Sequence, residues 1–226
     1  DIVSQVECVN IAETRSERAR MAVEQQARGA RRRAHTRAAL IGAAQQLLSE
    51  QRTQVPVLEI TELADVGMGS FYNHFSSKEE LFQAAIDDAL DAYGDLLDNW
   101  SKELTDPAEV FARSFRLTGR LHRLAPDLSR VLLANGAAVA NSSRGLAPRA
   151  LRDIEAGMAS GRFTISDARI GFLIVGGAAI NLGQTVLNDP DADDAVVTDQ
   201  VVYELLRMLG VPDHDAADIV SRPLPE

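Results

Sequence analysis

Apolar residues recur at steps of three and four along most of the chain, which is the spacing of helices that bury one face. The first clear stripe consists of Leu40, Ile41, Ala44, Leu47 and Leu48. Pro56 cannot stand in a helix interior, so the first helix, which starts near Ala34, must end before it. No apolar-polar alternation typical of a strand runs for a useful length. The pattern predicts an all-α fold of about nine or ten helices.

Proline, glycine and capping residues divide the rest of the chain into further helices. Ser77 and Glu80 form a capping box that opens a long helix, and Pro107, Pro126 and Pro148 stand where helices begin. The expected helices are a short one at 57–65, a short one that holds Phe71 and Phe75, and longer ones at 77–100, 106–124, 126–135, from 148 to 157 or 161, 166–187 and 193–209.

The charge of the chain is unevenly distributed. Residues 15–37 hold eight arginines and two glutamates, a net charge of +6, which leaves −16 for the remainder because the whole chain carries −10. Such segregation suits a protein that meets nucleic-acid phosphates with one end only, although a basic disordered tail is the plainer interpretation of an arginine run. Residues 1–30 lack a strong apolar period and are predicted to form a flexible basic arm.

The remaining composition favours a cytoplasmic protein without a metal or cofactor. Cys8 is the one cysteine and cannot form an intramolecular disulfide, and the first thirty residues hold no apolar segment of a signal peptide. The longest apolar stretch, 170–180, is too short to span a bilayer. The four histidines have no second ligand at zinc-like spacing, and we find no catalytic motif. No metal ligand and no catalytic residue are therefore predicted.

Three short helices followed by a long one, entered through an arginine-rich arm, are the layout of a helix-turn-helix domain. The segment ITELADVGMGSFYNHF at 60–75, followed by SKEELF at 77–82, resembles the TetR family of repressors. The resemblance covers residues 36–82. It implies a three-helix DNA-binding domain at 31–82 and a helical domain for ligand binding and dimerisation at 83–221.

One group of residues in this segment is expected to bind DNA phosphates. Gly69 and Ser70 are small, which lets the start of the third helix approach the duplex, and the Ser70 hydroxyl can donate to a phosphate oxygen. The resemblance implies phosphate contacts for Tyr72, His74 and Lys78. Phe71 and Phe75 are instead expected to pack on the first two helices and hold the reading helix in place.

A second group is expected to face base edges. Gly67, Met68 and Asn73 occupy such positions, and Asn73 can pair with adenine, whereas Met68 offers apolar contact. The resemblance suggests a phosphate contact for Thr36, with helix capping as a nearly equal alternative. The residues Arg31, Arg32 and Arg33 either contact phosphates or a minor groove, or remain solvated.

This sequence departs from the family pattern at the turn. Asp65 replaces the usual glycine, and Gly67 replaces the usual serine that caps the reading helix. Asp tolerates a left-handed conformation and Gly caps acceptably, so we expect the fold to survive. The operator sequence cannot be taken over from relatives.

The late helices are candidates for a dimer interface. The helix at 166–187 is dense in small residues, which indicates the close approach of another helix. By the resemblance, this helix and the next form a four-helix interface with a second subunit; a buried intrachain helix is the alternative. The stripe on the next helix consists of Val196, Val197, Val201, Leu205, Met208 and Leu209.

The middle helices would enclose a ligand cavity if the resemblance holds. Its candidate lining residues are Phe111, Phe115, His122, Leu132, Leu133, Asn135, Leu151, Met158, Phe172 and Asn181. Few unpaired polar groups stand among them, which favours an apolar inducer such as an acyl chain, a steroid or an aromatic compound.

The sequence thus predicts a ligand-responsive, homodimeric transcription repressor that leaves a palindromic double-stranded DNA operator when a small inducer binds. The alternatives are an all-α enzyme and a helical interaction protein without specific DNA binding. Specific, salt-sensitive binding to a palindromic site would separate these classes.

Overall fold

The computed structural model describes residues 2–136, 139 and 142–225, with side chains from residue 23 onward. The chain divides into two compact units. The first unit comprises Asp1–Ala44 and Val55–Leu81, and the second unit comprises Gln45–Gln54 and Phe82–Glu226. The described residues form ten helices and contain no strand, which confirms the predicted all-α fold.

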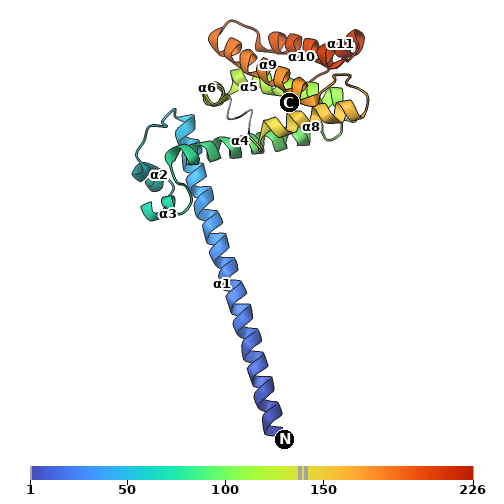
Figure 1. The fold of residues 1–226 in the computed structure, drawn as a ribbon. Helices are drawn as coiled ribbons and strands as arrows, with labels where there is room; N and C mark the ends of the chain where they lie inside the picture. The colour runs from blue at the N-terminus through green and yellow to red at the C-terminus, as the bar shows by residue number, and fades with distance from the viewer. Residues whose placement is uncertain (1, 137–138, 140–141, 226) are drawn as a thin grey trace. The chain divides into compact units, whose positions relative to one another are not determined.

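The first unit is built on three helices, α1 (Ile2–Ser49), α2 (Val57–Leu63) and α3 (Met68–Tyr72). Figure 1 shows α2 and α3 beside the C-terminal part of α1. The buried apolar side chains that hold the three helices together include Leu40, Ile41, Ala44, Ile60, Phe71 and Phe75. The predicted packing role of Phe71 and Phe75 is therefore visible in this core, but the expectation that both lie on the third helix is wrong, because α3 ends at Tyr72 and Phe75 follows the turn after it.

The helical start near Ala34 is wrong, because α1 is continuous from Ile2 (Figure 1). The segment that was expected to be a flexible arm has the conformation of a helix. Its many alanines and arginines are good helix formers, and Glu24 pairs with Arg28 at a spacing of four residues, 3.3 Å apart. Helix propensity therefore extends α1, although no apolar stripe marks that segment.

The second unit contains most of α4 and all later helices. The helices are α4 (Lys78–Ser101), α5 (Pro107–Leu124), α6 (Pro126–Ala134), α8 (Leu146–Ala159), α9 (Ala168–Asn188), α10 (Asp194–Leu209) and α11 (Asp213–Ser221). Asp106, Asp167 and Asp193 cap α5, α9 and α10 by accepting hydrogen bonds from backbone N–H groups. α8 begins at Leu146, two residues before the predicted start at Pro148.

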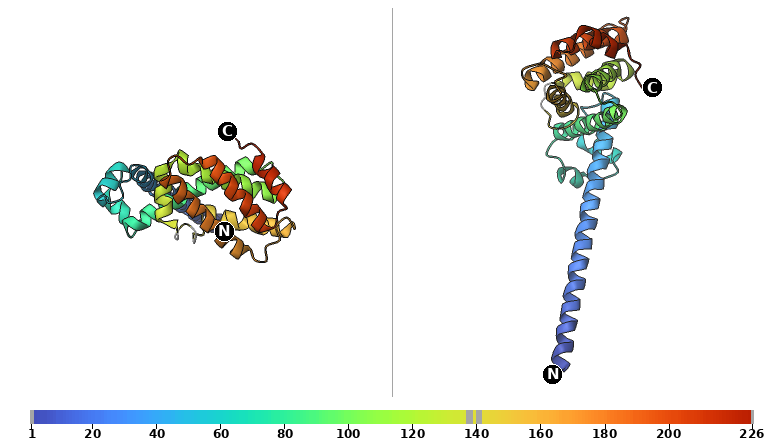
Figure 2. Two further views of the ribbon diagram at one scale, coloured as in Figure 1. Left: turned by 90° about the horizontal axis from the view of Figure 1, so that it is seen from above. Right: turned by 90° about the vertical axis from the view of Figure 1, so that its right-hand side faces the viewer.

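Helix α5 is central to the second unit, because it contacts α8, α9 and α10. The core that these helices share includes Phe111, Phe115, Ile154, Phe163 and Val202. The latest helices, orange to red, face the viewer in the left view of Figure 2. Helix α11 was not expected from the sequence, and it packs Ala216 and Ile219 into this core.

Candidate functional site

The turn before α3 forms although two of its residues, Asp65 and Gly67, depart from the family pattern. Asp65 has a backbone φ of +52°, the left-handed conformation for which a glycine is usual. Gly67 stands at the N-cap of α3 in an extended conformation and provides no side-chain hydrogen bond. Phe71 is fully buried, and its ring centroid lies 6.1 Å from that of Phe75. The reading helix is therefore fixed to the first unit by aromatic packing.

The opposite face of α3 is open. Tyr72 is 62% exposed and Met68 is 45% exposed, and Asn73 is exposed as well. A Cβ atom built on Gly69 would meet no protein atom within 4 Å, so the packing of the first unit does not require glycine at this position. These side chains and the bare backbone at Gly69 form one surface that is free to meet a ligand outside the first unit.

Two residues beside this surface have partners within the first unit. The Lys78 Nζ atom donates a hydrogen bond of 2.9 Å to the carbonyl oxygen of Val55, which ties the start of α4 to the segment before α2. An ammonium group has three donors, so two remain for a phosphate. Ser77 Oγ accepts from the Glu80 N–H at 3.2 Å, while the Glu80 carboxylate reaches Ser76 instead of completing the predicted capping box with Ser77.

The other predicted DNA-contacting residues lie on α1, on α3 or next to α3. Thr36 is half-buried inside α1, so the alternative that it caps this helix is wrong. Arg31, Arg32 and Arg33 are exposed, and within the part of the chain that the structure describes no acceptor is found for their guanidinium groups. The remaining three positions are Gly67, which is exposed, and Ser70 and His74, which are half-buried.

The second unit contains a cavity of about 180 Å³. Its wall is mostly apolar and is drawn from α4, α5, α6, α8 and α9. The apolar lining residues include Leu90, Leu97, Phe111, Phe115, Leu132, Leu133, Leu146, Phe172, Val175 and Ile180. The polar lining residues are Asp98, Ser114, Thr118, His122, Arg149 and Asp153. Such a wall suits a small ligand with an apolar body and few polar groups.

Two buried polar residues define the chemistry of the cavity wall. His122 Nδ1 lies 3.0 Å from Ser129 Oγ, and burial lowers the pKa of the imidazole, which is therefore neutral near pH 7. Asp153 is 9% exposed, and its Oδ1 atom accepts two hydrogen bonds from Arg152. Burial raises the pKa of Asp153 against the opposing effect of Arg152.

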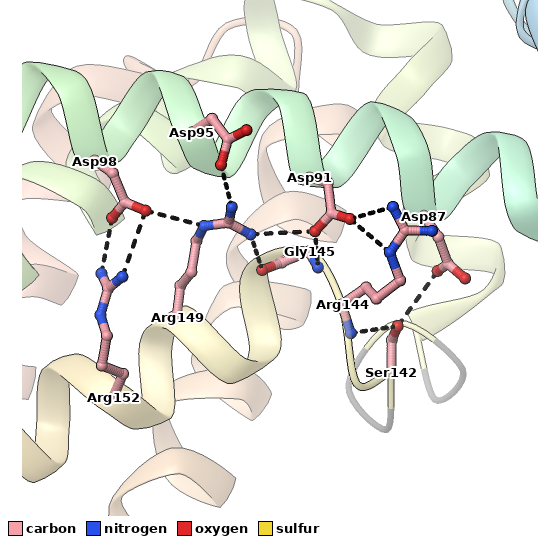
Figure 3. A network of polar contacts seen from close by, with 9 residues as sticks. All are labelled: Asp87, Asp91, Asp95, Asp98, Ser142, Arg144, Gly145, Arg149 and Arg152. Atoms are coloured by element: carbon pink, nitrogen blue, oxygen red, sulfur yellow. Dashed lines mark hydrogen bonds and ion pairs between the residues drawn. The ribbon is translucent and has the colours of Figure 1, made fainter. Parts of the chain in front are cut away.

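Ion pairs join α4 to α8 next to this cavity (Figure 3). The Arg149 guanidinium contacts three α4 carboxylates: Nη1 lies 3.2 Å from Asp91, Nε lies 3.1 Å from Asp98, and Nη2 donates to Asp95. Arg152 Nη2 lies 2.8 Å from the Asp98 carboxylate. Because Asp98 of α4 and Arg149 of α8 also line the cavity, the ion pairs between these two helices form part of the cavity wall.

Apolar side chains are exposed along one face of α9. Ile170, Leu173 and Ile174 are all substantially exposed, and Leu173 reaches 69%. A Cβ atom built on Gly177 would meet nothing within 4 Å, so this part of the face is open as well. In contrast, a Cβ atom on Gly183 would lie 2.6 Å from the His122 ring, which explains the close approach of α9 to α5 there.

Comparison with protein families identifies both parts of the chain. Residues 40–85 match the model of bacterial regulatory proteins of the tetR family. Residues 106–222 match the model of the tetracyclin repressor-like C-terminal domain, which is more than half of the chain. The chain belongs to the TetR family. The predicted family is thereby confirmed, and the protein is a ligand-responsive transcription regulator and not an enzyme.

Solved structures agree with this assignment. A crystal structure of RolR in complex with resorcinol shares 37% sequence identity with the regulator, with a TM-score of 0.71, and covers 87% of this chain and 98% of RolR. FadR from Bacillus subtilis in complex with stearoyl-CoA shares 18% identity, with a TM-score of 0.57 over 75% of this chain and 97% of FadR, which shows the common fold. No curated protein sequence matches the chain.

The cavity contains six of the ten residues that the sequence nominated for ligand binding, namely Phe111, Phe115, His122, Leu132, Leu133 and Phe172. The other four lie elsewhere. Asn135 Nδ2 donates to the carbonyl oxygen of Val131, and exposed Asn181 donates to that of Gly177. Met158 packs against the core, and half-buried Leu151 is not part of the wall.

The charged residues of the cavity wall, chiefly Asp98, Arg149 and Asp153, were not predicted from the sequence. A signal was present, because Asp153 lies in the stripe of α8 that also holds Ala147, Ile154 and Gly157, all of them buried. A carboxylate within a buried stripe indicates a partner or a function, since burying an unpaired charge is costly.

Helix α9 contains the apolar run at 170–180. The apolar run at 170–180 is short, but α9 as a whole has 21 residues and is long and apolar enough to cross a membrane by length and composition. Only 28% of its most apolar window is buried within the described part of the chain.

Proposed function

We propose that the regulator is a homodimeric, cytoplasmic repressor that binds a palindromic operator and is released by a single-ring aromatic compound. The open face of α3 supports the DNA-binding part. The phosphates are bound beside the backbone of Gly69 by Ser70, Tyr72, His74 and Lys78. Further phosphate contacts come from Thr36 and from Arg31, Arg32 and Arg33 of α1. Gly67, Met68 and Asn73 face the bases. The two reading helices of the dimer enter successive major grooves about 34–36 Å apart.

The exposed apolar face of α9 supports the dimer. Soluble proteins rarely leave a row such as Ile170, Leu173 and Ile174 in water, and a second copy of α9 would cover it. The open space at Gly177 lets two such helices approach closely. On α10, Val196 is exposed and available to the same interface, whereas Leu205 and Leu209 are buried in the core of their own unit.

The size of the cavity supports a single-ring ligand over an acyl chain or a steroid. A dry apolar cavity of about 150 Å³ accommodates benzene, and the cavity of the regulator measures about 180 Å³. The RolR structure, which shares 37% identity, contains resorcinol, a benzene ring with two hydroxyl groups. A small phenol is therefore the inducer that size and relationship favour together, and this match is the observation that carries the proposal.

Helix α4 provides the physical link between ligand and DNA. It begins at Lys78 in the first unit and contributes Leu90, Leu97 and Asp98 to the cavity wall in the second. A ligand that fits the cavity in only one position of α4 shifts the population toward that position. Coupling of this kind amounts to about 1–3 kcal/mol. A coupling free energy of this size lowers operator affinity by about 5- to 150-fold, which releases the operator when the protein concentration is close to the dissociation constant.

The proposal is tested by selecting DNA from a random pool and then adding resorcinol. We expect one palindromic sequence to be enriched, and fluorescence anisotropy to show its release by resorcinol but not by glycerol at the same concentration. Failure to enrich a sequence would contradict the DNA-binding part. Enrichment without release by any single-ring phenol would contradict the inducer part alone.

Replacing Arg31, Arg32 and Arg33 by glutamine tests whether α1 contacts phosphates. Each lost phosphate contact should lower the slope of log affinity against log salt by about 0.9, so the triple variant, which removes three arginines from each subunit of the dimer, should lose up to about 5.4. The measurement is anisotropy at several salt concentrations. Neutralising Lys102, Arg130 and Arg207 in the second unit removes the same charge and should leave the slope unchanged. Equal slopes for both triple variants would remove the α1 arginines from the DNA interface.

A further inference from the structure

Asp153 has one free carboxylate oxygen at the cavity wall. Both hydrogen bonds from Arg152, at 2.9 and 2.7 Å, end on Oδ1. Among the residues that the structure describes, none donates a hydrogen bond to Oδ2. The Asp153 residue is largely buried, at 9% exposed, and it lines the cavity. Because Oδ2 has no donor among the described residues and its carboxylate lies at the cavity wall, it is placed to accept a hydrogen bond from a ligand.

The other charged groups at the wall are largely occupied. Asp98 accepts from Arg149 through Oδ2 and from Arg152 through both oxygens. Arg149 donates to Asp91, Asp95, Asp98 and the carbonyl oxygen of Gly145, which uses four of its five N–H donors. The charged groups of the wall therefore offer a ligand mainly a hydrogen-bond acceptor, the Oδ2 atom of Asp153.

We propose that Asp153 is the residue that determines ligand specificity, by accepting a hydrogen bond from a hydroxyl group on an aromatic ring. The inference rests on the proposed single-ring inducer and adds the chemistry that selects it. A hydroxyl donates to Oδ2, while the ring occupies the apolar part of the wall near Phe111 and Phe172. Aryl ethers offer no hydrogen-bond donor to Asp153. Aromatic carboxylic acids bring a second negative charge beside it.

The charges around Asp153 fit this assignment. Arg152, Arg149 and Asp98 are the ionisable groups that act on its carboxylate, and the two arginines favour the ionised, accepting form. Burial disfavours that form, so Asp153 is held at a cost to the free protein that a donating ligand relieves. We therefore expect Asp153→Asn to fold with a melting temperature no lower than that of the unaltered protein.

The first test uses four probes on the unaltered dimer: resorcinol, 3-methoxyphenol, 1,3-dimethoxybenzene and 3-hydroxybenzoate. Titration calorimetry should show both phenols binding, with 1,3-dimethoxybenzene weaker than resorcinol by about 10- to 100-fold, the range for a hydrogen bond to a charged group. 3-Hydroxybenzoate should bind at least as weakly as the diether. Equal affinity of resorcinol and the diether would overturn the inference and leave the single-ring inducer standing.

The second test uses Asp153→Asn. The two Arg152 donors hold the amide oxygen, so the NH₂ group takes the place of Oδ2 and turns the acceptor into a donor. The variant should lose most of its affinity for resorcinol and bind 1,3-dimethoxybenzene at least as well. The matched control is Asp95→Asn, which removes a 70% exposed carboxylate from the same network but not from the cavity wall.

The outcomes separate this inference from the proposed function. If Asp153→Asn keeps the preference of the unaltered protein for resorcinol over the diether, Asp153 does not select the ligand. If no single-ring probe binds the unaltered dimer, the proposed inducer is wrong and the specificity assigned to Asp153 is wrong with it. The melting temperatures and operator affinities of both variants, measured without probe, report any loss of folding separately.

Discussion

Replacing Leu173 by glutamate should turn the dimer into monomers and lower operator affinity by about a hundredfold or more. Leu173 is 69% exposed on α9, between Ile170 and Ile174, where the proposed second subunit would bury it. A carboxylate there must be desolvated without a partner in each subunit. A dimer that holds two half-sites gains about 10²–10⁴ in affinity from its effective concentration, and a monomer forfeits that gain.

Sedimentation velocity and operator titration together check this prediction. The control is Leu124→Glu, because Leu124 at the end of α5 is even more exposed, at 81%, and is not on α9. That variant should remain dimeric and keep its operator affinity. A dimeric Leu173→Glu variant with unchanged operator affinity would show that the exposed face of α9 is not the interface.

Replacing Arg149 by methionine should destabilise the second unit by about 2 kcal/mol at pH 7. The substitution removes one cation from among Asp91, Asp95 and Asp98, which then repel one another (Figure 3). Breaking a fully buried ion pair costs about 3–5 kcal/mol, and the partial exposure of these carboxylates reduces that figure. Arg130→Met, which breaks one exposed pair with Asp127, should change the free energy of unfolding by less than about 0.5 kcal/mol.

The pH dependence of this loss has a defined sign. Burial alone would raise the pKa of Asp91, but hydrogen bonds from the Gly145 N–H, Arg149 and Arg144 outweigh it and hold the pKa below its ordinary value. Hydrogen bonding from Arg152, opposed by burial and aided by Arg149, lowers the pKa of Asp98 in the same way.

Carboxylates with a lowered pKa stabilise the folded state above the unfolded pKa of about 4, and this contribution is lost as the pH falls through the folded pKa. Without Arg149 the carboxylate pKa values rise. The gap between Arg149→Met and the unaltered protein should therefore be largest at pH 7 and shrink toward pH 4. Urea denaturation at pH 7, 5.5 and 4.5 measures it, and a gap that widens on acidification would contradict the assigned role of Arg149.

The sequence predicted the local structure of the helix-turn-helix segment because its signals are local. The capping serine, the paired aromatics Phe71 and Phe75, and the tolerated Asp65 each act within a few residues of one another. Helix starts at Asp106, Asp167 and Asp193 were also readable, since a capping side chain bonds its own helix. The start of α1 was not, because a helix of alanine and arginine needs no apolar stripe to form.

By itself, then, the sequence determined the all-α architecture and the family, because these follow from spacing along one helix at a time. It also nominated five of the apolar wall residues, Phe111, Phe115, Leu132, Leu133 and Phe172. Only the tertiary structure decided that Asp98, Arg149 and Asp153 meet at that wall, since they come from α4 and α8, about fifty residues apart. The chemistry of recognition arises where helices distant in sequence converge, and helical spacing contains no information about that meeting.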